Sequence, residues 1–124
     1  MPAKTIRLPD ADHPISIESN HKRIVVSVAG QVIADTQHAL TLREAKYPAV
    51  HYIPRQDVRM QLLQPSKHET FCPYKGDCSY FSIPVGGEKS TNAVWTYEHP
   101  NEAVNAISGY LAFYPDRVDS IEVS

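Results

Sequence analysis

Residues 24–35 read Ile-Val-Val-Ser-Val-Ala-Gly-Gln-Val-Ile-Ala-Asp, and this stretch determines the fold class. From Ile24 to Val28 an inward apolar side chain recurs at every second position, a period that is typical of a β-strand with one buried face. Ala29-Gly30 then offers a turn, after which Val32 and Ala34 resume the alternation against their polar or apolar neighbours. The sequence therefore predicts a β-hairpin.

Further strands are predicted outward from the hairpin, each bounded by residues that favour turns. They cover residues 49–53, 78–83, 92–98, 110–114 and 118–123. Pro48 and Pro54 bound the first of them, because the residue before a proline is kept extended. Two neighbouring glycines in residues 84–91 predict a mobile loop there.

Helical signals are few. Asp57 is predicted to cap one turn over residues 58–63, and Asn101 to cap residues 102–107. With two short helices and many strands, the chain is predicted to be mainly β (β-rich α+β), a single domain of antiparallel sheets. Residues 1–14 are polar and contain three prolines, so they are predicted to be an N-terminal tail on a domain that spans residues 15–124.

Composition limits the classes of function. The 124 residues are 42% hydrophobic and 21% charged with a net charge of −2, which predicts a globular protein without an electrostatic preference for nucleic acid. A secretion signal and a membrane span are both missing from the sequence pattern. We therefore expect a cytoplasmic protein with reduced thiols and no membrane partner. The oligomeric state is not predicted.

The densest group of reactive side chains is Thr70-Phe-Cys-Pro-Tyr-Lys-Gly76. An ammonium near Cys72 would favour the thiolate, so Cys72 is a candidate nucleophile. The alternative is a partly buried core thiol, since free cysteine is among the most buried residue types. A Cys72–Cys78 disulfide is sterically conceivable but is not expected in a reducing compartment.

A lysine beside a glycine turn can also hold an anion, with the ammonium and exposed backbone N–H groups as donors. Arg55 and Arg59 are four residues apart and could share one face of a helical turn, where they would converge with Lys75 on one cleft for phosphate or carboxylate. The alternative is a plain turn with a solvated lysine. The predicted ligand-binding residues are Arg55, Arg59, Tyr74, Lys75 and Gly76.

Carboxylates provide the other catalytic candidate. Glu44 is predicted either to act as an acid or base or to form a structural pair with Arg59. Trp95 and Tyr97 share one face of their strand and are interpreted as core more readily than as a stacking platform. The six histidines show no spacing of a metal site, so no metal is predicted, and the sequence leaves any other cofactor unassigned.

Six blocks of the sequence resemble, in order, the bacterial and fungal family known as domain of unknown function 427. They are residues 30–36, the segment that ends at Glu44, and residues 52–59, 70–76, 93–98 and 112–116. The resemblance implies a β-tent, in which two antiparallel sheets meet along an edge, as in methionine sulfoxide reductase B and the Yippee proteins. Those relatives often hold zinc between two CxxC knuckles, which this chain lacks.

The family carries a nucleotidyltransferase-like label, yet the Gly-Ser and paired aspartates that hold magnesium in those enzymes are missing here. Two functions from different classes remain as hypotheses. In the first, a polar cleft binds an anionic or nucleotide-like small molecule and acts on it through Cys72 or Glu44. In the second, the protein is a non-catalytic module that binds a ligand or another protein. A third interpretation is a structural domain whose polar motifs only specify the fold.

Overall fold

The computed structural model describes residues 4–124, which form three antiparallel sheets and five short 3-10 helices. The strands are β1 (Ile15–Asn20), β2 (Ile24–Val28), β3 (Gln31–Thr36), β4 (Ala39–Glu44), β5 (Val50–Tyr52), β6 (Gln64–Cys72), β7 (Gly76–Ser82), β8 (Val94–Thr96), β9 (Leu111–Phe113) and β10 (Ser120–Val123). The helices are η1 (Arg55–Asp57), η2 (Met60–Leu62), η3 (Pro84–Ser90), η4 (Glu102–Ile107) and η5 (Pro115–Arg117). The prediction of a mainly β domain of antiparallel sheets is confirmed.

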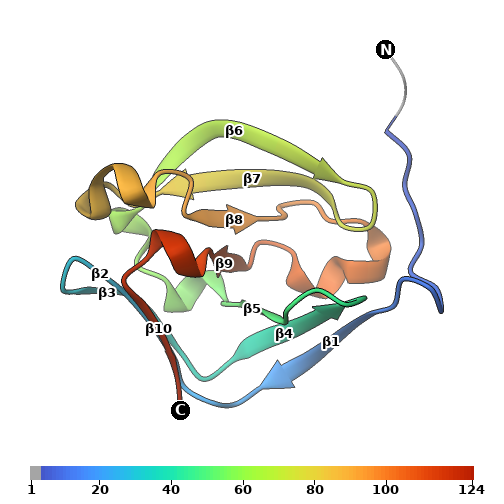
Figure 1. Ribbon diagram of the computed structural model, residues 1–124, viewed down its shortest axis with the longest axis horizontal. Helices are drawn as coiled ribbons and strands as arrows, with labels where there is room; N and C mark the ends of the chain where they lie inside the picture. The colour runs from blue at the N-terminus through green and yellow to red at the C-terminus, as the bar shows by residue number, and fades with distance from the viewer. Residues whose placement is uncertain (1–3) are drawn as a thin grey trace.

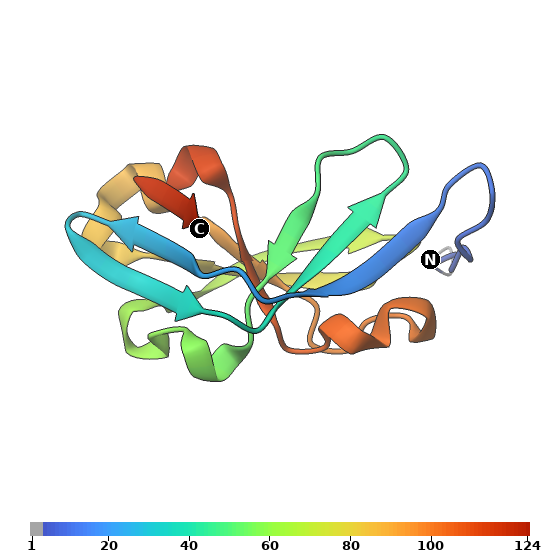
Figure 2. The same ribbon diagram turned by 90° about the horizontal axis from the view of Figure 1, so that it is seen from below.

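The three sheets form two layers. One layer is the four-stranded sheet β6-β7-β8-β9, and the other consists of two three-stranded sheets, β1-β4-β5 and β10-β2-β3. Figure 1 shows the larger sheet above the two smaller ones, and Figure 2 shows the smaller sheets side by side as two wings. Short links from β1 to β2 and from β3 to β4 join the wings, and an isolated bridge from Ile53 to Leu111 ties β5 to the larger sheet.

The predicted hairpin is formed by β2 and β3, and its turn has a positive φ at both Ala29 and Gly30, as a two-residue turn of this twist requires. A β-bulge interrupts the ladder after Val26. The simple alternation is consequently wrong in β3, where Ile33 is fully buried and Val32 is exposed. The bulge places one extra residue in β3 and turns the following side chains to the opposite face.

Other local predictions need correction. β1, β4 and β6 were not predicted as strands, and residues 84–91 form η3 instead of an open loop. A Cβ on Gly86 would lie 2.7 Å from a methyl group of Val28, so this segment packs directly on β2. Neither predicted helix cap forms: the Asp57 carboxylate accepts a hydrogen bond from Thr36 Oγ1, and the Asn101 amide donates to a backbone carbonyl.

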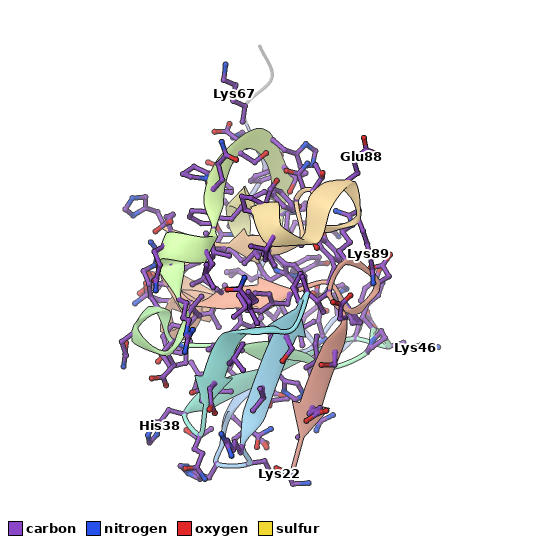
Figure 3. The ribbon with its side chains drawn as sticks, turned by 90° about the vertical axis from the view of Figure 1, so that its left-hand side faces the viewer. Lys22, His38, Lys46, Lys67, Glu88 and Lys89 are labelled. Atoms are coloured by element: carbon purple, nitrogen blue, oxygen red, sulfur yellow. The ribbon has the colours of Figure 1, made fainter. Side chains whose placement is uncertain are left out.

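The core divides into two clusters, one under each wing. The first lies under β10-β2-β3 and consists of aliphatic side chains and Phe113. The second lies under β1-β4-β5 and contains tyrosines and a cysteine. Figure 3 shows the side chains filling the space between the layers, whereas the labelled lysines Lys22, Lys67 and Lys89 point away from it. No helix within residues 4–124 is long and apolar enough to cross a membrane.

Residues 4–14 form no strand or helix but contact the domain at several points. The Arg7 N–H donates to the Pro73 carbonyl, and the Ala45 N–H donates to the Pro14 carbonyl. A turn at Asp10 forms because its carboxylate accepts from the N–H groups of Asp12 and His13. This turn directs His13 toward the end of β4.

Candidate functional site

The turn between β6 and β7 positions Lys75. Cys72 pairs with Gly76 at the end of the ladder, and the three residues between them form the turn. Asn101 holds this turn from outside, since its N–H donates to the Lys75 carbonyl and its Nδ2 donates to the Pro73 carbonyl. Gly76 has a φ of 108°, and a Cβ there would lie 3.2 Å from Asn101 Oδ1. A side chain larger than hydrogen would strain this position.

Lys75 points inward and forms a buried ion pair with Glu44 at the end of β4. The side chain of Lys75 is 11% exposed and that of Glu44 is 12% exposed. The second carboxylate oxygen of Glu44, Oε2, lies 2.7 Å from His13 Nε2. The His13 ring in turn stacks on Tyr74, with 3.8 Å between ring centroids. Three ionisable groups are therefore connected from the surface to the interior.

The electrostatics of Glu44 follow from these contacts. Burial alone would raise its pKa, but the hydrogen bonds from Lys75 and His13 outweigh burial and hold the pKa of Glu44 below its ordinary value. Glu44 is therefore ionised at neutral pH. The predicted structural pair between Glu44 and Arg59 is wrong, because Lys75 and His13 are the partners.

The ion pair faces a cavity of about 200 Å³ that we call the polar cavity. Its lining is Leu42, Glu44, Tyr47, Pro48, Val50, Tyr52, Lys75, Tyr80, Trp95, Tyr97 and Tyr114. The Tyr52 hydroxyl accepts a hydrogen bond from Trp95 Nε1, and the Tyr80 hydroxyl lies 2.9 Å from Thr70 Oγ1. Burial raises the pKa of Tyr52, Tyr80 and Tyr97, so these phenols stay protonated over the ordinary pH range.

A second cavity of about 540 Å³, which we call the apolar trough, adjoins the polar cavity. The two share four lining residues, Tyr47, Pro48, Val50 and Trp95. The rest of the trough comes from both wings and from β9, and its lining is otherwise apolar apart from His51. Burial, together with the nearby Arg43, lowers the pKa of His51, which favours the neutral imidazole. The trough and the polar cavity thus offer an apolar and a polar compartment side by side.

Of the residues predicted to form the site, only Glu44 and Lys75 line these two cavities within the described chain. Tyr74 lies on the outer side of the turn, between the His13 ring and the Arg7 guanidinium. Cys72 is half-buried against the second core cluster. Both cysteines are free thiols, and burial raises the pKa of the Cys78 thiol. The nucleophilic role predicted for Cys72 stays a prediction.

The two predicted arginines lie elsewhere. Arg55 forms an ion pair with Glu98, 2.8 Å between nitrogen and oxygen, and its Nε donates to the Gly109 carbonyl. Arg59 is exposed between η1 and η2, where its backbone N–H bonds to Ile33 of β3. The structure does not bring Arg55 and Arg59 into the lining of either cavity with Lys75. Their role in binding an anion stays a prediction.

Sequence reasoning missed most of the cavity. No local sequence signal points to His13, because it lies 31 residues from its partner Glu44 and no spacing connects them. The strand pattern favours core positions for Trp95 and Tyr97, and both also line the polar cavity. The usable signal is the aromatic content of β7 and of residues 94–97, where Tyr80 and the alternating pair Trp95 and Tyr97 occur.

The arrangement permits binding and proton transfer. A buried ammonium and carboxylate at a cavity wall can hold charged groups of a ligand. The chain His13–Glu44–Lys75 can also pass a proton between the cavity and the surface, because each member is ionisable and in hydrogen-bond contact. Among residues 4–124, no three His, Cys, Asp or Glu side chains come together as a metal site.

The chain belongs to the family described as a domain of unknown function (DUF427), since the model of that family matches residues 16–124. The match covers all ten strands except the first residue of β1. The resemblance noted in the sequence is thereby confirmed. No curated protein matches the chain.

Proposed function

We propose that this member of the DUF427 family binds a small molecule, with a charged head in the polar cavity and an apolar or aromatic body in the trough. The observation that carries the proposal is the buried Glu44–Lys75 pair at the wall of a cavity that opens onto the trough. Ligand sites combine apolar walls with a few convergent polar groups, and this pair supplies such groups.

A contribution to the stability of the fold is a weak explanation for the buried Glu44–Lys75 ion pair. Removing two charges from water costs several kcal/mol per ion, and a well-packed apolar pair of similar volume is often equally stable. The position of Glu44 and Lys75 beside empty volume is better explained by a ligand that exchanges contacts with them. An anionic group would accept hydrogen bonds from the Lys75 ammonium.

A nucleotide-like ligand is one member of this class. The polar cavity of about 200 Å³ is smaller than the roughly 300–1,000 Å³ of typical drug-sized pockets. A nucleotide would therefore place its phosphate near Lys75 and its base in the trough, against Trp95. Smaller anions would fill the polar cavity alone.

The test is thermal unfolding in the presence of phosphate, adenosine monophosphate and a panel of small carboxylates. A ligand at a hundred times its Kd adds about 2.7 kcal/mol of stability by mass action, which raises the Tm. We expect a shift that Lys75→Met abolishes. Lys89→Met is the matched control, because Lys89 forms an exposed pair with Asp119 and neither residue lines a cavity. No Lys75-dependent shift with any compound would overturn the proposal.

Proton transfer on the bound molecule is a second candidate function, favoured by the connected groups His13, Glu44 and Lys75. A covalent reaction through Cys72 is the competing chemistry from the sequence. Alkylation with iodoacetamide near neutral pH separates them: an activated Cys72 is modified rapidly in the folded protein, and buried Cys78 lags. If Cys72 reacts only after unfolding, proton transfer remains the chemistry to examine.

A further inference from the structure

The polar cavity is unusually rich in aromatic rings. Of its eleven lining residues, six are aromatic: Tyr47, Tyr52, Tyr80, Trp95, Tyr97 and Tyr114. The whole chain contains seven tyrosines and one tryptophan, so five of the seven and the single tryptophan gather here. Aromatic faces attract cations, and the attraction grows when water is excluded.

The formal charges of this cavity balance. Glu44 contributes a carboxylate and Lys75 an ammonium, and the phenols are neutral because burial disfavours their ionised form. Tyr47 sits at the rim, 67% exposed, whereas Tyr52 and Tyr97 are buried. The lining of the cavity therefore combines aromatic rings with one fixed charge of each sign, and Tyr47 is its solvent-exposed member.

This balance discriminates between ligands. A simple anion that binds Lys75 in place of Glu44 leaves the Glu44 carboxylate with His13 as its remaining partner. A simple cation that binds Glu44 in place of Lys75 leaves Lys75 without a counter-ion. An unpaired buried charge is costly. A molecule with both charges lets each protein group exchange one partner for another, so that no buried charge is left unpaired.

We propose, on the basis of the proposed function, that the ligand carries a small zwitterionic head. Its quaternary ammonium group lies among the aromatic rings near Glu44, and its carboxylate binds Lys75. A methylated ammonium suits rings better than a primary one, because it is weakly hydrated and presents a larger surface to the aromatic faces. The volume of about 200 Å³ is large enough for this zwitterionic head, and any apolar body of the ligand would lie in the trough, as in the proposed function.

The experiment uses three matched compounds and calorimetry on the full chain. Glycine betaine carries both charges. Its carbon isostere 3,3-dimethylbutanoate has the same shape and carboxylate but no cation, and tetramethylammonium has the cation alone. We expect betaine to bind at least about tenfold more tightly than either, as cation–π contacts and a second ion contact would give.

Variants identify the site. We expect Glu44→Gln to weaken betaine binding and to leave 3,3-dimethylbutanoate unaffected or bound better, and Lys75→Met to weaken both. Lys89→Met should change neither, since it lies outside the cavities. If a single variant fails to fold, the pair Glu44→Gln/Lys75→Met leaves no unpaired buried charge and should abolish the preference for betaine.

The relative affinities of the three compounds and the effects of the variants decide whether the zwitterion binds in the polar cavity. Equal affinity for betaine and 3,3-dimethylbutanoate would overturn the zwitterion and leave anion binding at Lys75 in place. Binding of none of the three compounds also overturns it; the proposed function then survives only if another compound of the wider panel gives a Lys75-dependent shift. If neither Glu44→Gln nor Lys75→Met changed the affinity for betaine, betaine would bind at a different site, and the assignment would be overturned.

Discussion

The two wings of the domain cover cores of different chemistry. Under β10-β2-β3 the buried cluster consists of Ile, Val, Leu, Ala and Phe side chains, with Ile24 and Ile33 fully buried. Under β1-β4-β5 the cluster contains three tyrosines and a thiol, and the buried Lys75 lies at its edge. Dispersion and the hydrophobic effect hold the first cluster, whereas the second also buries groups that need specific partners.

This difference teaches where stability and function are located. No hydrogen bond restricts the packing of the aliphatic core, and where Ile24, Val26 and Phe113 border the trough they present only apolar surface. The aromatic side pairs its two charges and the hydroxyls of Tyr52 and Tyr80, and the polar cavity lies among them. We therefore expect the aliphatic wing to dominate unfolding and the aromatic wing to dominate binding.

The largest expected effect tests the aliphatic wing. Ile33→Ala should lower the free energy of unfolding by about 4 kcal/mol, because it removes a fully buried side chain and leaves a cavity. Tyr97→Phe on the other wing should cost only about 1 kcal/mol, since it removes a hydroxyl and keeps the ring. Urea denaturation measures both. A larger loss for Tyr97→Phe would break the comparison.

The next effect tests the ion pair. Lys75→Met should cost about 3 kcal/mol, because Glu44 is left buried with His13 alone. Adding Glu44→Gln should restore more than half of that loss, and a double-mutant cycle gives the coupling. Simple additivity of the two substitutions would show that the pair is solvated, and the contrast between the wings would then be much weaker.

The dependence of stability on acidic pH offers a further test of the contrast between the two wings. The folded-state pKa of Glu44 lies below its unfolded value, so its contribution to stability is complete above the unfolded pKa of about 4.3 and is lost as pH falls through the lower folded pKa. Glu44→Gln should therefore flatten the fall in stability below about pH 4. Denaturation curves at a series of pH values measure this. Ile33→Ala serves as the control: it should lower the whole profile without changing its slope.

The smallest expected effect concerns the first residues of the described chain. His13→Ala removes one contact to Glu44 and the stacking on Tyr74, and should cost about 0.5–1 kcal/mol because the ring is partly exposed. The pKa of Glu44 should rise, since one of the hydrogen bonds that lower it is lost. Carboxylate NMR titration follows that change. An unmoved pKa would mean that Lys75 alone sets the ionisation of Glu44.

Much of the fold was predictable because the aliphatic wing has a local signal. Alternation in β2 and the turn at Ala29-Gly30 identify the hairpin, and the β2–β3 pairing joins residues that are close in sequence. β6 has no strand signal, because it is mostly exposed and its apolar residues do not alternate with polar ones. The signal of β1 is weak, because its two isoleucines are set among polar residues. The inward position of Ile33 depends on a bulge, which alternation cannot indicate.

The site was predictable only in part. The sequence points to Glu44 and to Lys75 separately, but their pairing joins residues 31 positions apart and has no local signature. Arg55 was expected at the same cleft, yet its partner is Glu98, 43 residues along the chain. The aromatic enclosure collects side chains from β5, β7, β8 and β9 and their flanks, so it exists only after the layers pack.

The pairing of β10 with β2 has a consequence for synthesis of the protein. Ile24, which is fully buried on the middle strand of the sheet β10-β2-β3, pairs with Val123 near the other end of the described chain. While the ribosome is still adding the intervening residues, the β2–β3 hairpin has one edge open and its apolar face without most of its cover. The nascent chain therefore cannot complete this wing during translation until residues 120–123 leave the exit tunnel, and that interval is when its unpaired edge is most exposed to other nascent chains.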